Sequence, residues 1–206
     1  MFKFMIQKID YSIAALVGFL TGIFLVPTAI NLGFKSYVVL FLLPLVAPLL
    51  IVFGVWLGKF ISRWLSVMSQ VSKFAAVGIS NTAIDFGILN LLSMATGITA
   101  GLQIGGVNVP GFVAAVINSY FWNQNWVFKG RESGEGALHD FPKFLAVSLV
   151  GLLINSGIII LGTSFSAGLG DFSAVTVLNI SKVAATGVVL GWNFVGYKFL
   201  VFRKNV

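Results

Sequence analysis

The sequence has no cysteine, one histidine and very little charge. Without cysteine there is no disulfide framework, no thiolate metal site and no cysteine nucleophile, and a single histidine, His139, excludes a histidine-rich metal site. Charged residues are 9% of the 206-residue chain, whereas an ordinary soluble domain has about 25%. So few charges cannot cover a soluble surface of this size. The composition therefore excludes a water-soluble enzyme, a disordered chain and a fibrous repeat.

Long apolar runs take the place of the missing charge. Hydrophobic residues make up 58% of the chain, and the mean hydropathy is +0.99. A helix that crosses a membrane needs roughly 20 apolar residues. Six such runs predict an all-α polytopic membrane protein with six transmembrane helices, the first retained rather than cleaved as a signal peptide. The runs are Tyr11–Ile30, Tyr37–Leu57, Phe74–Ala95, Val109–Phe128, Phe144–Phe165 and Phe172–Val201, with Gly-rich external loops expected near Thr96–Asn108 and Ser164–Asp171.

The distribution of Lys and Arg predicts the topology of these helices. The formal net charge is +7, which in a soluble protein would suggest nucleic-acid binding. In a membrane protein Lys and Arg mark the cytoplasmic side. Six spans place almost all of them on one side, only Lys35 on the other, and Lys182 inside the last span. We therefore expect an inner (cytoplasmic) membrane protein with both termini in the cytoplasm, a solvated cytoplasmic loop at 130–140 that contains His139, and no nucleic-acid partner.

An internal repeat runs through the last four predicted helices. The stretch KFAAV at 73–77 recurs as KFLAV at 143–147, each at the start of a span, and NQNWVFK at 123–129 parallels YKFLVFR at 197–203. Two helical hairpins in the same orientation would make a parallel repeat, which is common in carriers. A duplication that produced only a structural bundle is the open alternative.

Four motifs carry a resemblance to a known family. They are Lys-Phe-x-x-Val-Gly-x-x-Asn-Thr-x-x-Asp-Phe at 73–86, Asn-x-x-Trp-x-Phe-Lys at 123–129, Lys-Phe-x-x-Val-x-x-x-Gly-x-x-x-Asn at 143–155 and Trp-Asn-Phe at 192–194. In this order and spacing the chain resembles the GtrA-like family over about Val71–Arg203. The resemblance divides the chain into an N-terminal two-helix transmembrane extension (1–70) and a GtrA-like four-helix transmembrane domain (71–206).

The resemblance also implies a function. Members of the family are linked to the synthesis of cell-surface polysaccharide, and are thought to bind polyprenyl-phosphate carriers such as undecaprenyl phosphate or to move polyprenyl-phosphate-linked sugars across the membrane. A polyprenyl-phosphate glycosyltransferase is the partner that it implies. Two features depart from the family: the extension at 1–66, and Gln124 where a basic residue is expected.

Two ionisable residues fall inside the predicted spans, where charge is expensive and therefore a sign of function. Asp85 lies 12 residues beyond Lys73, and Lys182 lies 16 residues before Lys198. At 1.5 Å per residue these are depths of roughly 18 and 24 Å. We expect both side chains to face the interior and to pair. The pair could be a structural lock or a gate, or the lysine could offer its ammonium to a phosphate in transit.

Polar residues that share helix faces with these two predict a binding groove for a sugar or phosphate head group. Asparagines in a span can also serve only to hold helices together, and this alternative stays open. The predicted substrate-binding residues are Asn81, Asp85, Asn118, Asn123, Asn155, Lys182 and Asn193.

Basic residues at the cytoplasmic ends of the repeat helices predict a rim that captures a lipid phosphate. The alternative is the ordinary enrichment of Lys, Arg and Trp at a membrane boundary. The rim residues are Lys73, Lys129, Lys143, Lys198 and Arg203.

The chain shows no catalytic constellation and no nucleotide-binding glycine loop, so we expect neither an enzyme nor a cofactor or metal. The leading interpretation is a protein that binds and flips polyprenyl phosphate or its sugar-linked form for cell-surface glycan synthesis. A non-transporting scaffold for a membrane glycosyltransferase is the alternative. A small multidrug exporter ranks last, because such exporters need a glutamate inside the membrane and no predicted span contains one. The sequence leaves open whether the protein forms a homo-oligomer.

Overall fold

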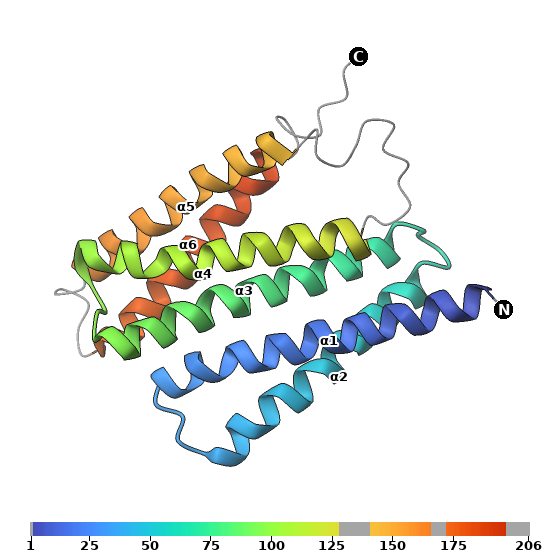
Figure 1. Cartoon of the computed structure of the whole chain (residues 1–206), viewed down its shortest axis with the longest axis horizontal. Coiled ribbons are helices and arrows are strands. Elements are labelled where there is room, and N and C mark those ends of the chain that lie inside the picture. The colour runs from blue at the N-terminus through green and yellow to red at the C-terminus, as the bar shows by residue number, and fades with distance from the viewer. Residues whose placement is uncertain (1, 128–140, 166–171, 197–206) are drawn as a thin grey trace. The chain divides into compact units, whose positions relative to one another are not determined.

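The computed structural model describes residues 2–127, 141–165 and 172–196, and these residues are almost entirely helical (Figure 1). They form six α-helices and a short π-helix, and they contain no strand. All six α-helices are long and apolar enough to cross a membrane, which confirms the all-α polytopic fold. The elements are α1 (Phe2–Asn31), α2 (Tyr37–Ile61), α3 (Met68–Thr96), α4 (Gly101–Trp122), the π-helix η1 (Asn123–Val127), α5 (Phe141–Ser164) and α6 (Ala174–Gly196).

The start of α4 corrects one sequence prediction. The stretch Thr96–Asn108 was expected to be an external loop, yet α4 begins at Gly101 and only 97–100 connect it to α3. Glycines such as Gly105 and Gly106 gave the loop signal, but a membrane helix tolerates such residues when its neighbours accommodate them. At Gly105 a Cβ atom would lie 2.5 Å from Ile160 Cδ1, so this glycine permits close packing inside a helix.

The chain divides into two compact units. Unit 1 consists of Met1–Leu91 and Val113–Arg131, and unit 2 consists of Leu92–Phe112 and Glu132–Val206. The boundary between them falls within α3 and α4. The division into an extension (1–70) and a domain (71–206), and the parallel repeat of two hairpins, therefore stay predictions.

In unit 1, α1 and α2 form an antiparallel hairpin whose backbones touch (Figure 1). A Cβ atom at Gly18 would overlap the backbone of Pro48, and one at Gly22 would overlap the backbone of Pro44. Because the two glycines are four residues apart, they lie on one face of α1 and open a groove for α2. The connection between these helices turns at Gly33, whose φ of +91° lies in the region that glycine adopts without strain.

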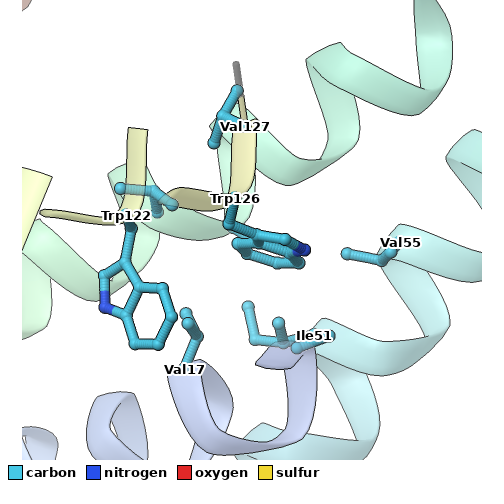
Figure 2. Packing of buried hydrophobic residues seen from close by; sticks show 9 residues of the cluster. Val17, Ile51, Val55, Trp122, Trp126 and Val127 are labelled. Atoms are coloured by element: carbon cyan, nitrogen blue, oxygen red, sulfur yellow. The ribbon is translucent and has the colours of Figure 1, made fainter. Parts of the chain in front are cut away.

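A cluster of buried apolar side chains fixes the end of α4 and η1 against this hairpin (Figure 2). The Trp122 and Trp126 rings meet edge to face, with centroids 6.2 Å apart. Aromatic pairs in this geometry stabilise beyond the area that they bury. The cluster contains Ala14, Val17, Ile51, Val55, Ala76, Val77, Trp122, Trp126 and Val127.

In unit 2, α5 and α6 form a second antiparallel hairpin (Figure 1). Small residues again bring the two helices together: a Cβ atom at Gly162 would overlap the side chain of Ser181. Near the other end of the hairpin, Trp192 Nε1 donates a hydrogen bond to the Val147 carbonyl at 2.9 Å. Among the buried polar residues of the hairpin, Asn155 of α5 and Lys182 of α6 are the most deeply buried, with 1% and 0% of their surfaces exposed.

Candidate functional site

A buried lysine and two asparagines form the polar centre of unit 2. The Lys182 side chain is 0% exposed, and so is that of Asn108. Lys182 Nζ donates to Asn108 Oδ1 at 2.5 Å and to Asn155 Oδ1 at 3.0 Å. Asn108 Nδ2 donates in turn to Asn155 Oδ1 and to Ser156 Oγ, both at 3.0 Å. Three helices, α4, α5 and α6, thus each supply one member of the Lys182 centre, which is the name that we use for Lys182, Asn108 and Asn155.

The amide groups of the Lys182 centre replace water around a charge. An unsolvated ammonium in a low-dielectric interior costs far more than proteins tolerate. The two amide oxygens stabilise the ammonium through their dipoles, and hydrogen bonds to charged groups are the stronger ones. Neither amide oxygen carries a formal charge, so these two bonds leave the charge of Lys182 in place. Two amide oxygens thus contribute to the solvation of a cation inside a membrane protein.

The sequence predicted two members of this centre and missed the third. Asn155 and Lys182 were among the predicted binding residues, whereas Asn108 was assigned to a loop. A signal for Asn108 was present, because it lies four residues after Ile104 and a helix would place both on one face. The structure buries both of them completely.

Asp85 is buried in α3, with 7% of its surface exposed. Asp85 belongs to unit 1 and Lys182 to unit 2. The pairing of these two residues therefore stays a prediction.

Two more predicted residues form a hydrogen-bonded chain in unit 1. Trp122 Nε1 donates to Asn118 Oδ1 at 2.9 Å, and Asn118 Nδ2 donates to Asn81 Oδ1 at 2.7 Å. The chain joins α3 to α4 and orients both asparagine amides. It is an interhelical contact of the kind that also holds membrane helices together.

The remaining predicted asparagines differ in their surroundings. Asn123 Nδ2 donates to Ser119 Oγ at 3.1 Å. The Oδ1 atoms of Asn123 and Asn193 are buried and accept no hydrogen bond from any residue that the structure describes. Burying an unsatisfied acceptor is costly, so a hydrogen-bond donor beside either oxygen would be favourable.

The sequence missed a second polar cluster, around Asp10. Its Oδ2 atom lies 2.7 Å from Lys59 Nζ, and its Oδ1 atom lies 2.7 Å from Lys73 Nζ. Trp126 Nε1 also donates to Oδ1, at 2.9 Å. We call Asp10, Lys59, Lys73 and Trp126 the Asp10 cluster. A signal was again present, because Asp10, Ala14, Val17 and Thr21 follow a helical spacing and all four are buried.

Of the predicted basic rim, the structure describes Lys73 and Lys143. Lys73 belongs to the Asp10 cluster, with its side chain 15% exposed, and Lys143 is exposed on α5. Lys129, Lys198 and Arg203 lie outside the described residues, as does the predicted loop at 130–140 with His139. Within the described ranges, no group of three His, Asp or Glu side chains is arranged to hold a metal ion.

Six membrane-spanning helices with polar centres in their interior define a multi-pass membrane protein. Residues 73–202 match the family model described as GtrA/DPMS, transmembrane domain, so the chain belongs to this family and the predicted resemblance is confirmed. The family segment begins at Lys73 of the Asp10 cluster and contains all of the Lys182 centre.

Two curated proteins illustrate the similarity. The uncharacterized membrane protein YngA of Bacillus subtilis (strain 168) is 30% identical over 149 residues, which are 72% of this chain and 89% of that protein. A dolichol-phosphate mannosyltransferase of Pyrococcus furiosus is 26% identical over 93 residues, which are 45% of this chain and 25% of that enzyme. No solved structure matches the chain.

Proposed function

We propose that this protein binds polyprenyl phosphate, or a sugar linked to it, and moves the phosphate-bearing head group across the membrane for the synthesis of cell-surface glycans. Its membership of the GtrA/DPMS family supports this ligand class, as does its similarity to an enzyme named for dolichol phosphate, itself a polyprenyl phosphate. The proposed role is to bind and move the lipid without making or breaking bonds. The proposed location is the inner membrane, with both termini in the cytoplasm.

The observation that carries the proposal is the Lys182 centre. A fully buried ammonium is expensive to maintain in a membrane, and residues of this kind mark the paths of ions and substrates. Lysine presents a compact point charge with three donors, which suits a phosphate oxygen arriving from any direction. A phosphate oxygen would accept from Lys182 in exchange for an amide oxygen of Asn108 or Asn155. The amide Nδ2 groups could then donate to other oxygens of the head group.

The other predicted residues enter the proposal by their chemistry. The amides of Asn81, Asn118, Asn123 and Asn193 would donate to sugar hydroxyls or phosphate oxygens during the passage. Asp85 would accept a proton or pair with a cation as the charged head group moves. The predicted rim of Lys73, Lys129, Lys143, Lys198 and Arg203 would attract the lipid phosphate from the cytoplasmic leaflet.

Reconstitution of the full chain in vesicles tests this proposal. A fluorescent polyprenyl-phospho-sugar is added, and its movement between leaflets is followed with a quencher that cannot cross the membrane. Lys182→Gln removes the charge and keeps polar atoms near the two asparagines, so we expect the rate to fall by at least about tenfold, which corresponds to losing about 1.4 kcal/mol of stabilisation. Lys35→Gln is the matched control, because Lys35 is exposed between α1 and α2. Equal rates for Lys182→Gln and the unmodified protein would refute the proposal.

A scaffold for a membrane glycosyltransferase is the second candidate. Along α2 and the turn that follows it, the rings of Phe53, Trp56, Phe60 and Trp64 are stacked or edge to face, with successive centroids 5.8, 5.8 and 5.3 Å apart, and all four side chains are exposed. Such a row of aromatic side chains could receive a partner within the membrane. Three quarters of the Pyrococcus furiosus mannosyltransferase lie outside the matched segment, which fits a membrane domain that works beside a larger enzyme.

The same vesicles distinguish the two candidates. A scaffold moves no lipid when reconstituted alone. It would instead increase the activity of a polyprenyl-phosphate glycosyltransferase added to the vesicles, and the substitution Trp64→Ala would reduce that increase. Lipid movement by the protein alone would exclude a purely scaffolding role.

A further inference from the structure

Three donors from three different elements converge on the carboxylate of Asp10. Lys59 Nζ from α2 and Lys73 Nζ from α3 each lie 2.7 Å from one of its oxygens. Trp126 Nε1 from η1 donates to Oδ1 at 2.9 Å. In Figure 2 the indole nitrogen of Trp126 lies on the side of the ring that faces Val55, one helical turn before Lys59. Two ammonium groups and an N–H donor around one anion are the donor set that binds a phosphate.

All four residues of the Asp10 cluster lie near the ends of their membrane spans. Because successive spans run in opposite directions, the starts of the first and third spans and the ends of the second and fourth lie on the same side of the membrane. Asp10 is the second residue of the span Ile9–Asn31, and Trp126 precedes the last residue of the span Gly101–Val127. Lys59 is close to the end of Tyr37–Ile61, and Lys73 is close to the start of Met68–Thr96. The ends of spans lie at the depth of the lipid head groups, where Trp and Lys are favoured. The Asp10 cluster is therefore at the depth of lipid phosphates, unlike the Lys182 centre.

The charges of the Asp10 cluster do not cancel, because two cations share one carboxylate. The side chains of Lys59 and Lys73 are 14% and 15% exposed, and the Lys59 Nζ atom itself is buried, so both charges are shielded from solvent. Shielded charges attract a counter-ion more strongly than exposed ones. Lys59 also lies over the Tyr11 ring, 4.5 Å from its centroid, and Lys73 lies 5.8 Å from the centroid of Trp126. Cation–π contacts with these rings thus stabilise both ammonium groups in addition to the carboxylate.

We propose that Lys59, Lys73 and Trp126 form a site for the phosphate of a membrane lipid, and that Asp10 is its internal competitor. When the site is empty of lipid, the carboxylate pairs with both ammonium groups and accepts a hydrogen bond from Trp126. A phosphate monoester, with up to two negative charges, displaces the carboxylate and binds both lysines. The first helix therefore controls access to the site.

This inference extends the phosphate-binding rim of the proposed function, and it rests on that proposal for its ligand class. It adds Lys59, Trp126 and the competing Asp10, which the predicted rim does not contain. Asp10 and Lys59 precede the family segment 73–202, whereas Lys73 and Trp126 lie within it. The two helices before the family segment thus supply both the competitor and half of the cationic charge.

Lipid binding to the purified full chain in detergent tests the proposal. The probe is dioleoyl phosphatidic acid, a lipid phosphate monoester, and its Kd is measured by native mass spectrometry. Phosphatidylcholine, whose phosphate carries a cationic choline, and inorganic phosphate are the comparison ligands. Asp10→Asn keeps the shape of the side chain and removes the competing charge. We expect it to bind phosphatidic acid at least about tenfold more tightly than the unmodified protein. Asp10→Asn should leave the weaker binding of phosphatidylcholine unchanged.

A second variant covers the case in which Asp10→Asn does not fold. Lys73→Gln leaves Asp10 paired with Lys59 and should weaken phosphatidic acid binding at least about tenfold. Lys35→Gln, at the opposite end of the α1–α2 hairpin, should not change it. Trp126→Phe keeps the aromatic ring and removes the N–H donor, and should weaken binding to an intermediate degree.

The outcomes separate this inference from the proposed function. If Lys73→Gln weakens binding and Asp10→Asn does not strengthen it, the lysine binds phosphate but Asp10 is no competitor, and the inference is wrong while the proposed function stands. If neither the unmodified protein nor Asp10→Asn binds phosphatidic acid, the inference is wrong, and the transport assay in vesicles decides the proposed function separately. Binding of inorganic phosphate as tight as that of phosphatidic acid would assign the site to a soluble ion and would also overturn the inference.

Discussion

Lys182 and Asn108 are 74 residues apart in the chain, and the ammonium of one lies 2.5 Å from the amide oxygen of the other. The hydrogen bond joins α6 to α4, and Asn155 of α5 completes the Lys182 centre. Two neutral side chains thereby help to accommodate a charge that would be prohibitive in an apolar bundle. Four predictions concern this centre, the predicted role of Asp85, the packing of unit 1 and the predicted topology.

The substitution Asn108→Asp places a carboxylate against Lys182 with little change in shape. The new ion pair is buried and hydrogen-bonded, so we expect the protein to fold with equal or higher thermal stability. The neutralised lysine should lose its attraction for phosphate, and movement of the polyprenyl-phospho-sugar should fall by at least about tenfold. The control is Asn125→Asp on the exposed side of η1. Normal transport by Asn108→Asp would mean that the charge of Lys182 has no part in it.

Asp85→Asn tests the sequence prediction that this acid pairs with Lys182 and couples transport to protons. We expect transport to slow and to lose its dependence on a pH gradient. If the two residues pair, the double variant Asp85→Asn/Lys182→Gln should unfold with less loss of stability than the sum of the single variants, by about 0.5–3 kcal/mol. Unchanged transport in Asp85→Asn would refute the coupling, and additive stabilities would refute the pairing.

Gly22→Val should disrupt the α1–α2 hairpin. The new side chain would overlap the backbone of Pro44, which cannot move aside as a flexible side chain could. We expect a loss of about 1–3 kcal/mol or more in the free energy of unfolding in detergent. Gly54→Val is the matched control on α2, because a Cβ atom there has no neighbour within 4 Å. Equal stabilities of the two variants would contradict this packing.

The absence of cysteine allows a direct test of the predicted topology. Lys35→Cys and Ser66→Cys each introduce a single thiol at an exposed position, after α1 and after α2 respectively. In intact cells, a maleimide that cannot cross the membrane should label Cys at position 35 and leave position 66 unlabelled. Permeabilised cells should show labelling at both. The reverse pattern would place the termini outside.

The six spans could be predicted from the sequence because a long apolar run is visible within each segment and depends on no contact with other segments. It also predicted Lys182 and Asn155 as interior polar residues, since a charge or amide in the middle of an apolar run needs no partner to be noticed. Asn108 was missed because glycines such as Gly105 and Gly106 are loop signals in water and acceptable helix residues in a membrane. The contact of Ile160 with Gly105 distinguishes a packed helix from a loop here, and Ile160 belongs to a helix far away in the chain.

Asp10 was missed for a different reason. An acid at the edge of an apolar run is typical of a solvated tail, and the sequence does not show that Lys59, Lys73 and Trp126 approach it from three other elements. Long-range convergence of this kind depends on how helices pack. The four-residue spacing of Gly18 and Gly22, and the buried stripe that begins at Asp10, were signals of that packing within α1 alone.

The Asp10 cluster limits how this protein can be shortened in the laboratory. Cutting the chain back to its family segment would remove Asp10 and Lys59 and leave Lys73 and Trp126 without their shared acceptor. A minimal four-helix version would therefore need compensating changes, such as Lys73→Gln together with Trp126→Phe, before its behaviour could be compared with that of the whole chain. Without those changes, a loss of function after truncation could result from the unpaired ammonium of Lys73 as readily as from the missing helices.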